Sequence, residues 1–233
     1  MGQTLLAEHA RATARDAERV ATVPIAATPL TYAFAKRALD VSLSVCVLIA
    51  ALPVFAILAV LIRLDSPGPI VFRQRRVGLG GRVFSFYKLR TMVTDARERF
   101  PQLYAYRYTR EEFVDLVLKT PDDPRLTRLG RVLRKTSVDE LPNLLNVLRG
   151  DMSLVGPRPE LPEMVGYYTD EELAKFSVRP GVTGLWQVSG RAILRNGQQL
   201  AADVEYVRHR SFGFDLMILV RTVRAVVLRI GAF

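Results

Sequence analysis

The sequence predicts an α+β protein, in which a small globular domain follows an N-terminal membrane helix. Three observations support this fold class. An uncharged apolar run covers residues 45–62, β-prone segments flank a glycine cluster at residues 78–81, and later segments carry apolar residues at helical spacing. We therefore divide the chain of 233 residues into an N-terminal arm (1–33), a membrane helix (34–65) and a globular domain (66–233).

The composition restricts the chemistry that this chain can perform. Its 33 basic and 23 acidic side chains give a formal net charge of +10, which favours an anionic partner such as a nucleic acid, a phosphorylated metabolite or an anionic lipid. Cys46 is the single cysteine, so no intramolecular disulfide and no cysteine-based metal site can form. His9 and His209 alone give little basis for a zinc site or a Ser-His-Asp hydrolase. Carboxylates, basic groups and a divalent cation remain.

The N-terminal arm, residues 1–33, is expected to be mobile or weakly helical. It combines scattered charges and alanines with no sustained apolar stretch. It also lacks the basic start and early apolar region of a cleavable signal peptide.

The apolar run is expected to enter a membrane. Its 18 uncharged residues (45–62) would extend ~27 Å as a helix, close to the ~30 Å hydrocarbon core of a bilayer. Pro53, in the middle, predicts a kink or break. Basic residues, which mark the cytoplasmic side, flank the run at both ends: Lys36, Arg37, Arg63, Arg73, Arg75 and Arg76. A re-entrant helix keeps both flanks on that side; a single spanning helix with a proline kink is the alternative.

After the membrane segment, residues 70–72 and 83–87 are predicted to be two short strands joined by the glycine turn at 78–81. These glycines could instead cradle a phosphate, but the Gly-x-x-x-x-Gly-Lys-Ser/Thr pattern is missing, which favours the hairpin. The second strand ends with two cations, Lys88 and Arg90.

Two helical regions are predicted next. Residues 95–119 alternate charged and aromatic side chains, which indicates surface helices that look replaceable. The following segment places four apolar residues on one helical face: Leu126, Leu129, Val132 and Leu133. Its other positions are basic: Arg125, Arg128, Arg131, Arg134 and Lys135. These cations form either a solvated face or, because two carboxylates follow directly, a phosphate-binding surface.

The carboxylates Asp139 and Glu140 open the next predicted helix. Ser137 and Glu140 match a capping box, which would keep Glu140 in a local structural role. With Asp139 as the cap instead, Pro142 falls at the third helical position, where no hydrogen bond is lost. In a functional interpretation, one carboxylate attacks phosphorus and its neighbour holds Mg²⁺, which neutralises substrate phosphates. A purely structural role for both residues stays open.

Arg158 is the third candidate, because Pro157 and Pro159 hold it in a rigid segment suited to binding a phosphate or a nucleotide. A plain turn is the alternative. Near the C-terminus, an apolar stretch at residues 212–220 precedes Arg221, Arg224 and Arg229. This pattern predicts an amphipathic interfacial helix, with a buried core helix as the alternative.

Five motifs occur in order along the chain: Lys36-Arg37-x-x-Asp40, and residues 88–92, 134–142, 150–159 and 179–187. Together they resemble the bacterial sugar transferase family, the monotopic polyprenyl-phosphate phosphoglycosyl transferases. The likeness covers roughly residues 34–233. The length and the Gly231-Ala232-Phe233 end are similar to the compact galactosyl-phosphate transferases that start exopolysaccharide synthesis.

The resemblance implies a ping-pong reaction at the cytoplasmic face of the bacterial inner membrane. A UDP-sugar would give its hexose 1-phosphate to polyprenyl (undecaprenyl) phosphate and release UMP. Asp139 matches the nucleophile, which would form an aspartyl-phosphosugar intermediate, and Glu140 matches the residue associated with Mg²⁺. The cations expected around the substrates and their phosphates are Lys88, Arg90, Arg134, Arg158 and Arg179. The resemblance also implies a re-entrant helix broken at a Ser-Pro pair; this chain has Leu52-Pro53, so the break depends on the proline.

Two other functions are compatible with the residues. A membrane glycosyltransferase would transfer the sugar alone and release UDP. A non-catalytic membrane anchor would use its basic surface for lipid or nucleic acid. We expect a UDP-sugar, polyprenyl phosphate and membrane lipid as partners, and no nucleic acid, because few aromatic residues are interleaved with the arginines. No motif specifies the sugar or the oligomeric state.

Overall fold

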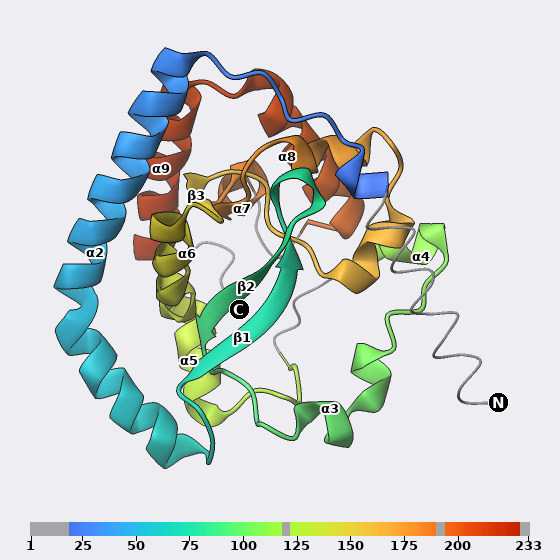
Figure 1. The fold of residues 1–233 in the computed structure, drawn as a ribbon. Helices are drawn as coiled ribbons and strands as arrows, with labels where there is room; N and C mark the ends of the chain where they lie inside the picture. The colour runs from blue at the N-terminus through green and yellow to red at the C-terminus, as the bar shows by residue number, and fades with distance from the viewer. Residues whose placement is uncertain (1–18, 118–121, 190–193, 229–233) are drawn as a thin grey trace.

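A computed structural model describes residues 19–117, 122–189 and 194–228, and it combines helices with two small sheets (Figure 1). The α-helices are α2 (Leu30–Asp65), α3 (Ala96–Arg99), α4 (Arg110–Asp115), α5 (Arg128–Thr136), α6 (Leu144–Arg149), α7 (Leu185–Ser189), α8 (Asn196–His209) and α9 (Phe212–Val227). The strands are β1 (Val71–Val77), β2 (Val83–Leu89), β3 (Ser153–Val155) and β4 (Gly181–Thr183). The 3-10 segments are Leu79–Gly81, Pro101–Tyr104, Val138–Asn143, Pro162–Tyr167 and Glu172–Ser177. The predicted α+β class is confirmed.

The predicted hairpin is also present. β1 and β2 pair antiparallel, from Val71 opposite Leu89 to Val77 opposite Val83. The turn between them uses positive φ angles at Gly80 (58°) and Gly81 (77°), a conformation that side chains other than glycine rarely adopt. The second sheet is a short parallel pair of β3 and β4.

Two of the three apolar clusters among the described residues fix the hairpin and the helices around it. One lies beneath β2 and joins α6, β3, α8 and α9, with Phe86, Val147, Met152, Tyr206 and Ile218 at most 1% exposed. The other joins the helical segments of the opposite half. Burial of each large side chain contributes about 1.5 to 3 kcal/mol, so these clusters fix the hairpin against the helices that carry the candidate site.

The described segment before α2 lies against the domain, and residues 19–21 of the arm expected to be mobile or weakly helical are helical. Val20 is 1% exposed and belongs to the second apolar cluster. The amide of Ala26 donates to the carbonyl oxygen of Ser177 (3.0 Å). Helix α2 begins at Leu30, so the expected boundary at residue 34 is corrected as well. The sequence concealed this packing because it depends on contacts with distant residues, such as the hydrogen bonds from Arg19 to Tyr168 and from Arg210 to Ala27. The first 18 residues of the arm lie outside the described part.

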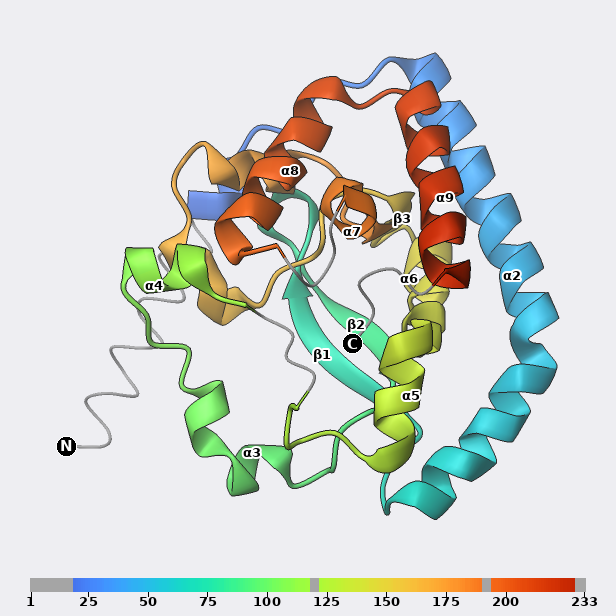
Figure 2. The ribbon, with the colours of Figure 1, turned by 180° about the vertical axis from the view of Figure 1, so that it is seen from behind.

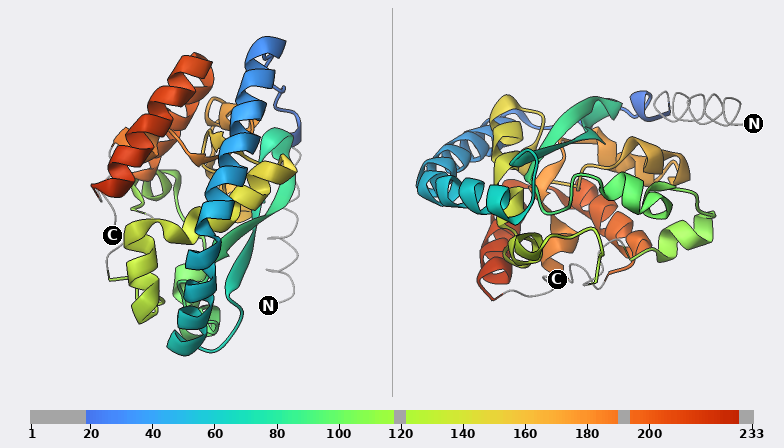
Figure 3. Two further views of the ribbon diagram at one scale, coloured as in Figure 1. Left: turned by 90° about the vertical axis from the view of Figure 1, so that its left-hand side faces the viewer. Right: turned by 90° about the horizontal axis from the view of Figure 1, so that it is seen from below.

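Helix α2 contains 36 residues, about 54 Å of helix, and continues through Pro53. Its ribbon curves along one side of the molecule (Figures 1 and 3), so the proline lies in a bent helix without a gap. Among the described residues it is the one helix long and apolar enough to cross a membrane, and only 6% of its most apolar window is buried. Ile49, Leu52 and Ile57 are each 62% exposed, as expected for a lipid-facing surface.

Polar side chains near the start of α2 attach it to the domain. Lys36 Nζ lies 2.7 Å from Asp215 Oδ2 of α9. Arg37 donates to two carbonyl oxygens in the last turn of α6 (2.6 and 2.9 Å). Asp40 Oδ1 accepts from the backbone amide of Leu154 (2.9 Å). The Lys-Arg-x-x-Asp motif therefore has a structural role here.

Helix α9 lies beside α2, as the opposite views in Figures 1 and 2 show. It buries Asp215 and Ile218 and exposes Val220 (71%), Val223 (64%) and Val227 (72%). This helix thus has one buried face and one exposed apolar face. Its predicted position at a membrane interface stays a prediction, and Arg229 lies outside the described residues.

Candidate active site

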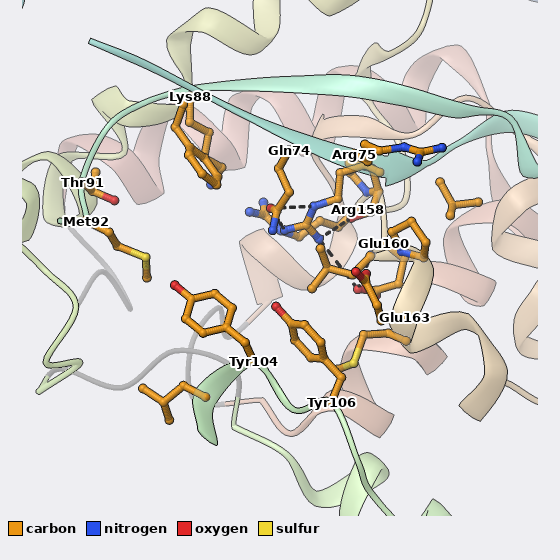
Figure 4. A pocket seen from close by; sticks show the side chains of 18 of the residues that line it. Gln74, Arg75, Lys88, Thr91, Met92, Tyr104, Tyr106, Arg158, Glu160 and Glu163 are labelled. Atoms are coloured by element: carbon orange, nitrogen blue, oxygen red, sulfur yellow. Dashed lines mark hydrogen bonds and ion pairs between the residues drawn. The ribbon is translucent and has the colours of Figure 1, made fainter. Parts of the chain in front are cut away.

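A cleft of about 1350 Å³ opens between the β1–β2 hairpin, the segment around residues 101–108 and the 3-10 segment at 162–167 (Figure 4). Of the seven site residues predicted from the sequence, six line it: Lys88, Arg90, Arg134, Asp139, Glu140 and Arg158. Arg179 does not belong to its lining. Residues from three distant parts of the chain therefore meet at one cavity.

The segment that carries the two carboxylates is not the capped α-helix expected. Val138–Asn143 forms a 3-10 helix, and Ser137 before it has a left-handed backbone (φ 58°) without a side-chain capping bond. The capping-box alternative is therefore wrong. Its physical reason is Pro142, which lies inside this segment and cannot donate the hydrogen bond that an α-helix would require there. The Glu140 side chain consequently points to tertiary partners.

Glu140 is the centre of a hydrogen-bonded cluster. Its Oε1 is in contact with Lys88 Nζ and accepts from Arg158 Nη2 (3.0 Å), and its Oε2 accepts from Asn143 Nδ2 (2.7 Å). Asp139, which is 5% exposed, has its Oδ2 3.7 Å from the same Lys88 ammonium. The structure thus brings both carboxylates, the lysine and the proline-flanked arginine together.

Two buried asparagines hold the carboxylate segment against β2. Asn143 Oδ1 accepts from the amide of Tyr87 (3.2 Å), and Asn146 Nδ2 donates to the carbonyl oxygen of Ser85 (2.7 Å). Neither asparagine has exposed surface. These bonds fix the distance between Glu140 and Lys88 on the strand. The sequence did carry a signal for them, namely two polar residues three apart in an otherwise apolar stripe.

Close packing between two backbone segments positions Arg158. It follows β3, which pairs with β4, and glycines at both strands let the chains approach. A Cβ on Gly156 would lie 2.5 Å from the carbonyl oxygen of Arg179, and one on Gly181 would lie 2.1 Å from the Gly156 nitrogen. Larger residues would force the two segments apart. The glycines therefore set the position from which Arg158 reaches Glu140.

Arg90 and Arg179 both donate hydrogen bonds to backbone carbonyl oxygens. The guanidinium of Arg90, a residue 4% exposed, donates at 2.5 to 3.0 Å to the carbonyl oxygens of Ile62, Ser66 and Pro67. It therefore caps the C-terminal end of α2. Arg179 is exposed outside the cleft, and its Nε donates to the carbonyl oxygen that ends α6 (3.1 Å). Backbone carbonyl groups already engage both side chains in this structure, and the phosphate-binding role of Arg90 and Arg179 stays a prediction.

The basic helix α5 divides its cations between two environments. Arg134 lines the cleft, 3.6 Å from Asp123 Oδ2. Arg128, Arg131 and Lys135 are exposed and lie outside the cleft, so they form the solvated face. Burial lowers the pKa of Arg134, although Asp139 and Asp123 oppose this effect.

The cations of the cluster respond differently to burial. Burial lowers the pKa of Lys88, and Glu140 and Asp139 partly restore it. For Arg158, burial is outweighed by the charge and hydrogen bond of Glu140, so its pKa is raised. The carboxylates and cations are mutually dependent: each stabilises the charged form of the other in a poorly solvated place.

Comparison with known proteins agrees with this arrangement. Residues 31–229 match the family model described as Bacterial sugar transferase. The chain belongs to this family. It is 39% identical over 203 residues to Galactosyl transferase CpsE of Streptococcus agalactiae, covering 87% of this chain and 44% of the relative. The UDP-glucose:undecaprenyl-phosphate glucose-1-phosphate transferase of Caulobacter vibrioides is 42% identical over 209 residues (85% of this chain, 72% of the relative). Exopolysaccharide production protein ExoY of Sinorhizobium fredii is 38% identical over 198 residues (85% and 88%).

The family predicted from the motifs is thereby confirmed. The chain spans less than half of the length of the first relative and most of the length of the other two. Its match begins one residue after the start of α2 and runs through α9, so the membrane helix, the cleft and the C-terminal helix all belong to the matched region.

Glu140 is the residue that the sequence predicts to bind Mg²⁺. Among the described residues no group of three or more His, Cys, Asp or Glu side chains converges. Mg²⁺ in phosphate-transferring sites commonly uses one or two carboxylates together with substrate phosphates, and Glu140 is a carboxylate at the cleft. Binding of Mg²⁺ at Glu140 stays a prediction.

Sequence reasoning missed one wall of the cleft. The segment at residues 95–119, expected to be replaceable surface helices, supplies Tyr104 and Tyr106 to the cavity (Figure 4). The signal in the sequence was the alternation of tyrosines at positions 104, 106 and 108, which presents them at regular intervals. These side chains lie across the cavity from Lys88 (Figure 4).

Proposed function

We propose that this chain transfers a hexose 1-phosphate from a UDP-sugar to undecaprenyl phosphate and releases UMP, as the first membrane step of exopolysaccharide or glycoconjugate synthesis. The observation that carries this proposal is the cluster of Asp139, Glu140, Lys88 and Arg158 at the cleft. The names of relatives in Caulobacter vibrioides and Salmonella typhimurium, which specify undecaprenyl-phosphate glucose and galactose transfer, support the class of acceptor.

In the first step, a carboxylate oxygen of Asp139 attacks the phosphorus that carries the sugar. A new bond forms between that oxygen and phosphorus, and the bond from this phosphorus to the bridging oxygen of the diphosphate breaks. UMP leaves with the electron pair of the broken bond. Covalent catalysis by a carboxylate splits the transfer into two displacements. Lys88 and Arg158 lie where they can stabilise the negative charge that develops on the phosphates.

In the second step, a phosphate oxygen of undecaprenyl phosphate attacks the same phosphorus. The bond between phosphorus and Asp139 breaks, which regenerates the carboxylate and yields an undecaprenyl diphosphate sugar. The glycosidic bond between sugar and phosphate stays intact throughout. A glycosyltransferase would break that bond and release UDP.

Glu140 is the residue that would hold Mg²⁺, which leaves Asp139 to attack phosphorus. When bound, the ion would neutralise donor phosphates that otherwise repel an anionic nucleophile. Glu140 keeps its position through Asn143, Lys88 and Arg158. This support orients the carboxylate before the substrate arrives.

The re-entrant course of α2 belongs to the same proposal. Residues before α2 and after it contact the same domain: Ala26 bonds to Ser177, and β1 pairs with β2. A domain on one face of a bilayer cannot bind both ends of a helix that crosses the bilayer completely. Together with the basic flanks, this supports entry and exit of α2 at the cytoplasmic face of the inner membrane.

The test is nucleotide release by the purified chain in detergent with undecaprenyl phosphate, Mg²⁺ and a panel of UDP-sugars. We expect UMP from wild type, loss by at least about 1000-fold in Asp139→Asn, and loss with a chelator. The exposed Asp170, which is 93% accessible in its side chain, gives a matched control, and Asp170→Asn should retain activity. A donor labelled in the sugar should label wild type covalently in the absence of acceptor, and leave Asp139→Asn unlabelled.

Other outcomes separate the alternatives. Release of UDP would identify a glycosyltransferase and remove the role of Asp139. No nucleotide from any donor, in a protein with a cooperative unfolding transition, would favour the non-catalytic membrane anchor.

A further inference from the structure

The tyrosine wall of the cleft has no part in the proposed phosphoryl transfer. Tyr104 and Tyr106 point their hydroxyl groups into the cavity, toward the side where Gln74, Lys88 and Arg158 lie (Figure 4). Both tyrosines are partly exposed, so a ligand in the cavity can reach them. The wall therefore faces whatever part of the donor extends beyond the phosphates.

Tyr106 is held in a conformation that its residue type disfavours. Its φ angle is 47°, in the left-handed region, where a bulky side chain is strained. The hydroxyl of Tyr167 fixes this turn, since it donates to the carbonyl oxygen of Tyr106 (2.8 Å) and accepts from the amide of Tyr108 (3.2 Å). Strain of this kind persists where surrounding structure enforces it and concentrates at ligand sites. Here it directs the Tyr106 side chain into the cleft.

Glu163 also lines this side of the cleft, and its carboxylate has an oxygen without a hydrogen-bond donor among the described residues. Its Oε2 is buried, and no described residue forms a hydrogen bond with it. Buried polar atoms in folded proteins nearly always have a partner, so a ligand hydroxyl at this place would satisfy it. Burial, with a smaller effect of the Glu163 charge, raises the pKa of Tyr106, which keeps its hydroxyl protonated and able to donate.

The chemistry of this wall suits a sugar better than a base or a phosphate. The guanidinium groups of Arg97 and Arg125 already lie over the Tyr104 ring (5.3 and 5.1 Å to its centroid), so cations occupy the ring of this tyrosine. A stacked base would have to displace these cations. A carboxylate such as Glu163 repels phosphate but accepts hydrogen bonds from hydroxyl groups.

We propose that Tyr104, Tyr106 and Glu163 bind the hexose of the sugar nucleotide and select among hexoses by the configuration of their hydroxyl groups. This inference rests on the proposed function, because it assigns the sugar end of the same donor. Hydrogen bonds to specific hydroxyls give strong selection, since an epimer leaves the buried Glu163 oxygen without its donor.

The test measures donor binding without turnover, using the Asp139→Asn protein and calorimetry with UDP-glucose, UDP-galactose and UDP. One of the two sugar nucleotides should bind more tightly than UDP. Adding Tyr106→Phe or Glu163→Gln to this protein should raise the Kd of that sugar nucleotide by about five- to tenfold and leave the Kd of UDP unchanged. Tyr87→Phe is the matched control, because Tyr87 is not part of the cleft lining and its hydroxyl contacts Arg149.

If the variants weakened the binding of UDP and of the sugar nucleotide equally, the nucleoside would lie on this wall and the proposal would be overturned. Unchanged affinities in both variants, or sugar nucleotides that bind no better than UDP, would overturn it as well. A failure of the proposed function would give a different result. The protein with Asp139 intact would release no UMP, while Tyr106→Phe would still raise the Kd of the sugar nucleotide and leave that of UDP unchanged.

Discussion

Replacing Asp215 with asparagine is expected to weaken the attachment of the membrane helix α2 to the domain. Asp215 is 1% exposed and accepts three hydrogen bonds: from Lys36 Nζ (2.7 Å), from the Tyr32 hydroxyl (2.8 Å) and from the Tyr206 hydroxyl (2.7 Å). Lys36 and Tyr32 belong to α2, whereas Asp215 and Tyr206 come from α9 and α8. One carboxylate therefore joins three helices.

The size of the effect follows from the burial of this cluster. Asparagine keeps the shape, but it removes the charge opposite Lys36 and replaces one acceptor oxygen with a donor. Removing one partner of a buried ion pair costs about 3 to 5 kcal/mol. The Lys36 side chain is 18% exposed, so partial solvation favours the lower end of that range. At about 2 to 4 °C per kcal/mol for a protein of this size, the Tm should fall by roughly 6 to 12 °C.

Thermal unfolding in lipid nanodiscs, followed by the fluorescence of the single tryptophan, Trp186, measures this change. Asp170→Asn is the control, because the exposed pair of Arg19 and Asp170 should contribute at most about 1 kcal/mol. Lys36→Met added to Asp215→Asn should recover part of the lost stability, since the unpaired ammonium is then gone. A Tm of Asp215→Asn equal to that of the control, or no recovery by Lys36→Met, would refute the reasoning.

Two further results are expected. Burial raises the pKa of Asp203 to about 6, although Lys175 (2.9 Å away) opposes it, so the folded state binds this proton more tightly than the unfolded state. The free energy of unfolding of wild type, relative to that of Asp203→Asn, should therefore be greatest below pH 4. It should decline by about 3 kcal/mol as the pH rises through 6. A difference that does not depend on pH would contradict this. In a Cys46→Ala background, cysteines placed at the exposed Thr28 and Arg75 should both react with an impermeant maleimide in inverted vesicles and neither in intact spheroplasts. Reaction of only one of them in spheroplasts would indicate a spanning helix.

Local patterns predicted the parts of this structure that depend on neighbouring residues. The hairpin followed from β-prone segments around glycines, and β1 and β2 form it. Asp139 and Glu140 were identified as an adjacent pair, and the rigid segment of Arg158 as a place for a fixed cation. The structure brings these side chains to Lys88. Covalent neighbours and prolines determine such features, so they are visible in a linear sequence.

The features that the sequence did not predict depend on contacts between distant segments. Arg90 and Arg134 were equivalent as cations in the sequence, yet Arg90 bonds to three carbonyl oxygens at the end of α2 and Arg134 faces the cleft. Composition cannot show which carbonyl groups a guanidinium will meet. For the same reason the tyrosine wall was missed: Tyr106 depends on a hydrogen bond from Tyr167, 61 residues away.

If the proposed function is correct, the contacts of Arg90 have a geometric consequence for the lipid phosphate that would react at the cleft. Arg90 and Lys88 are two positions apart where β2 ends, about 7 Å along an extended chain. The same short piece of backbone thus contacts the last turn of the membrane helix and the carboxylates of the cleft. No flexible linker lies between them, so the depth at which α2 sits in the bilayer sets the height of the carboxylates above the headgroups. A membrane of different thickness or surface charge would then alter the rate at which a lipid phosphate reaches Asp139, without changing any residue of the cleft.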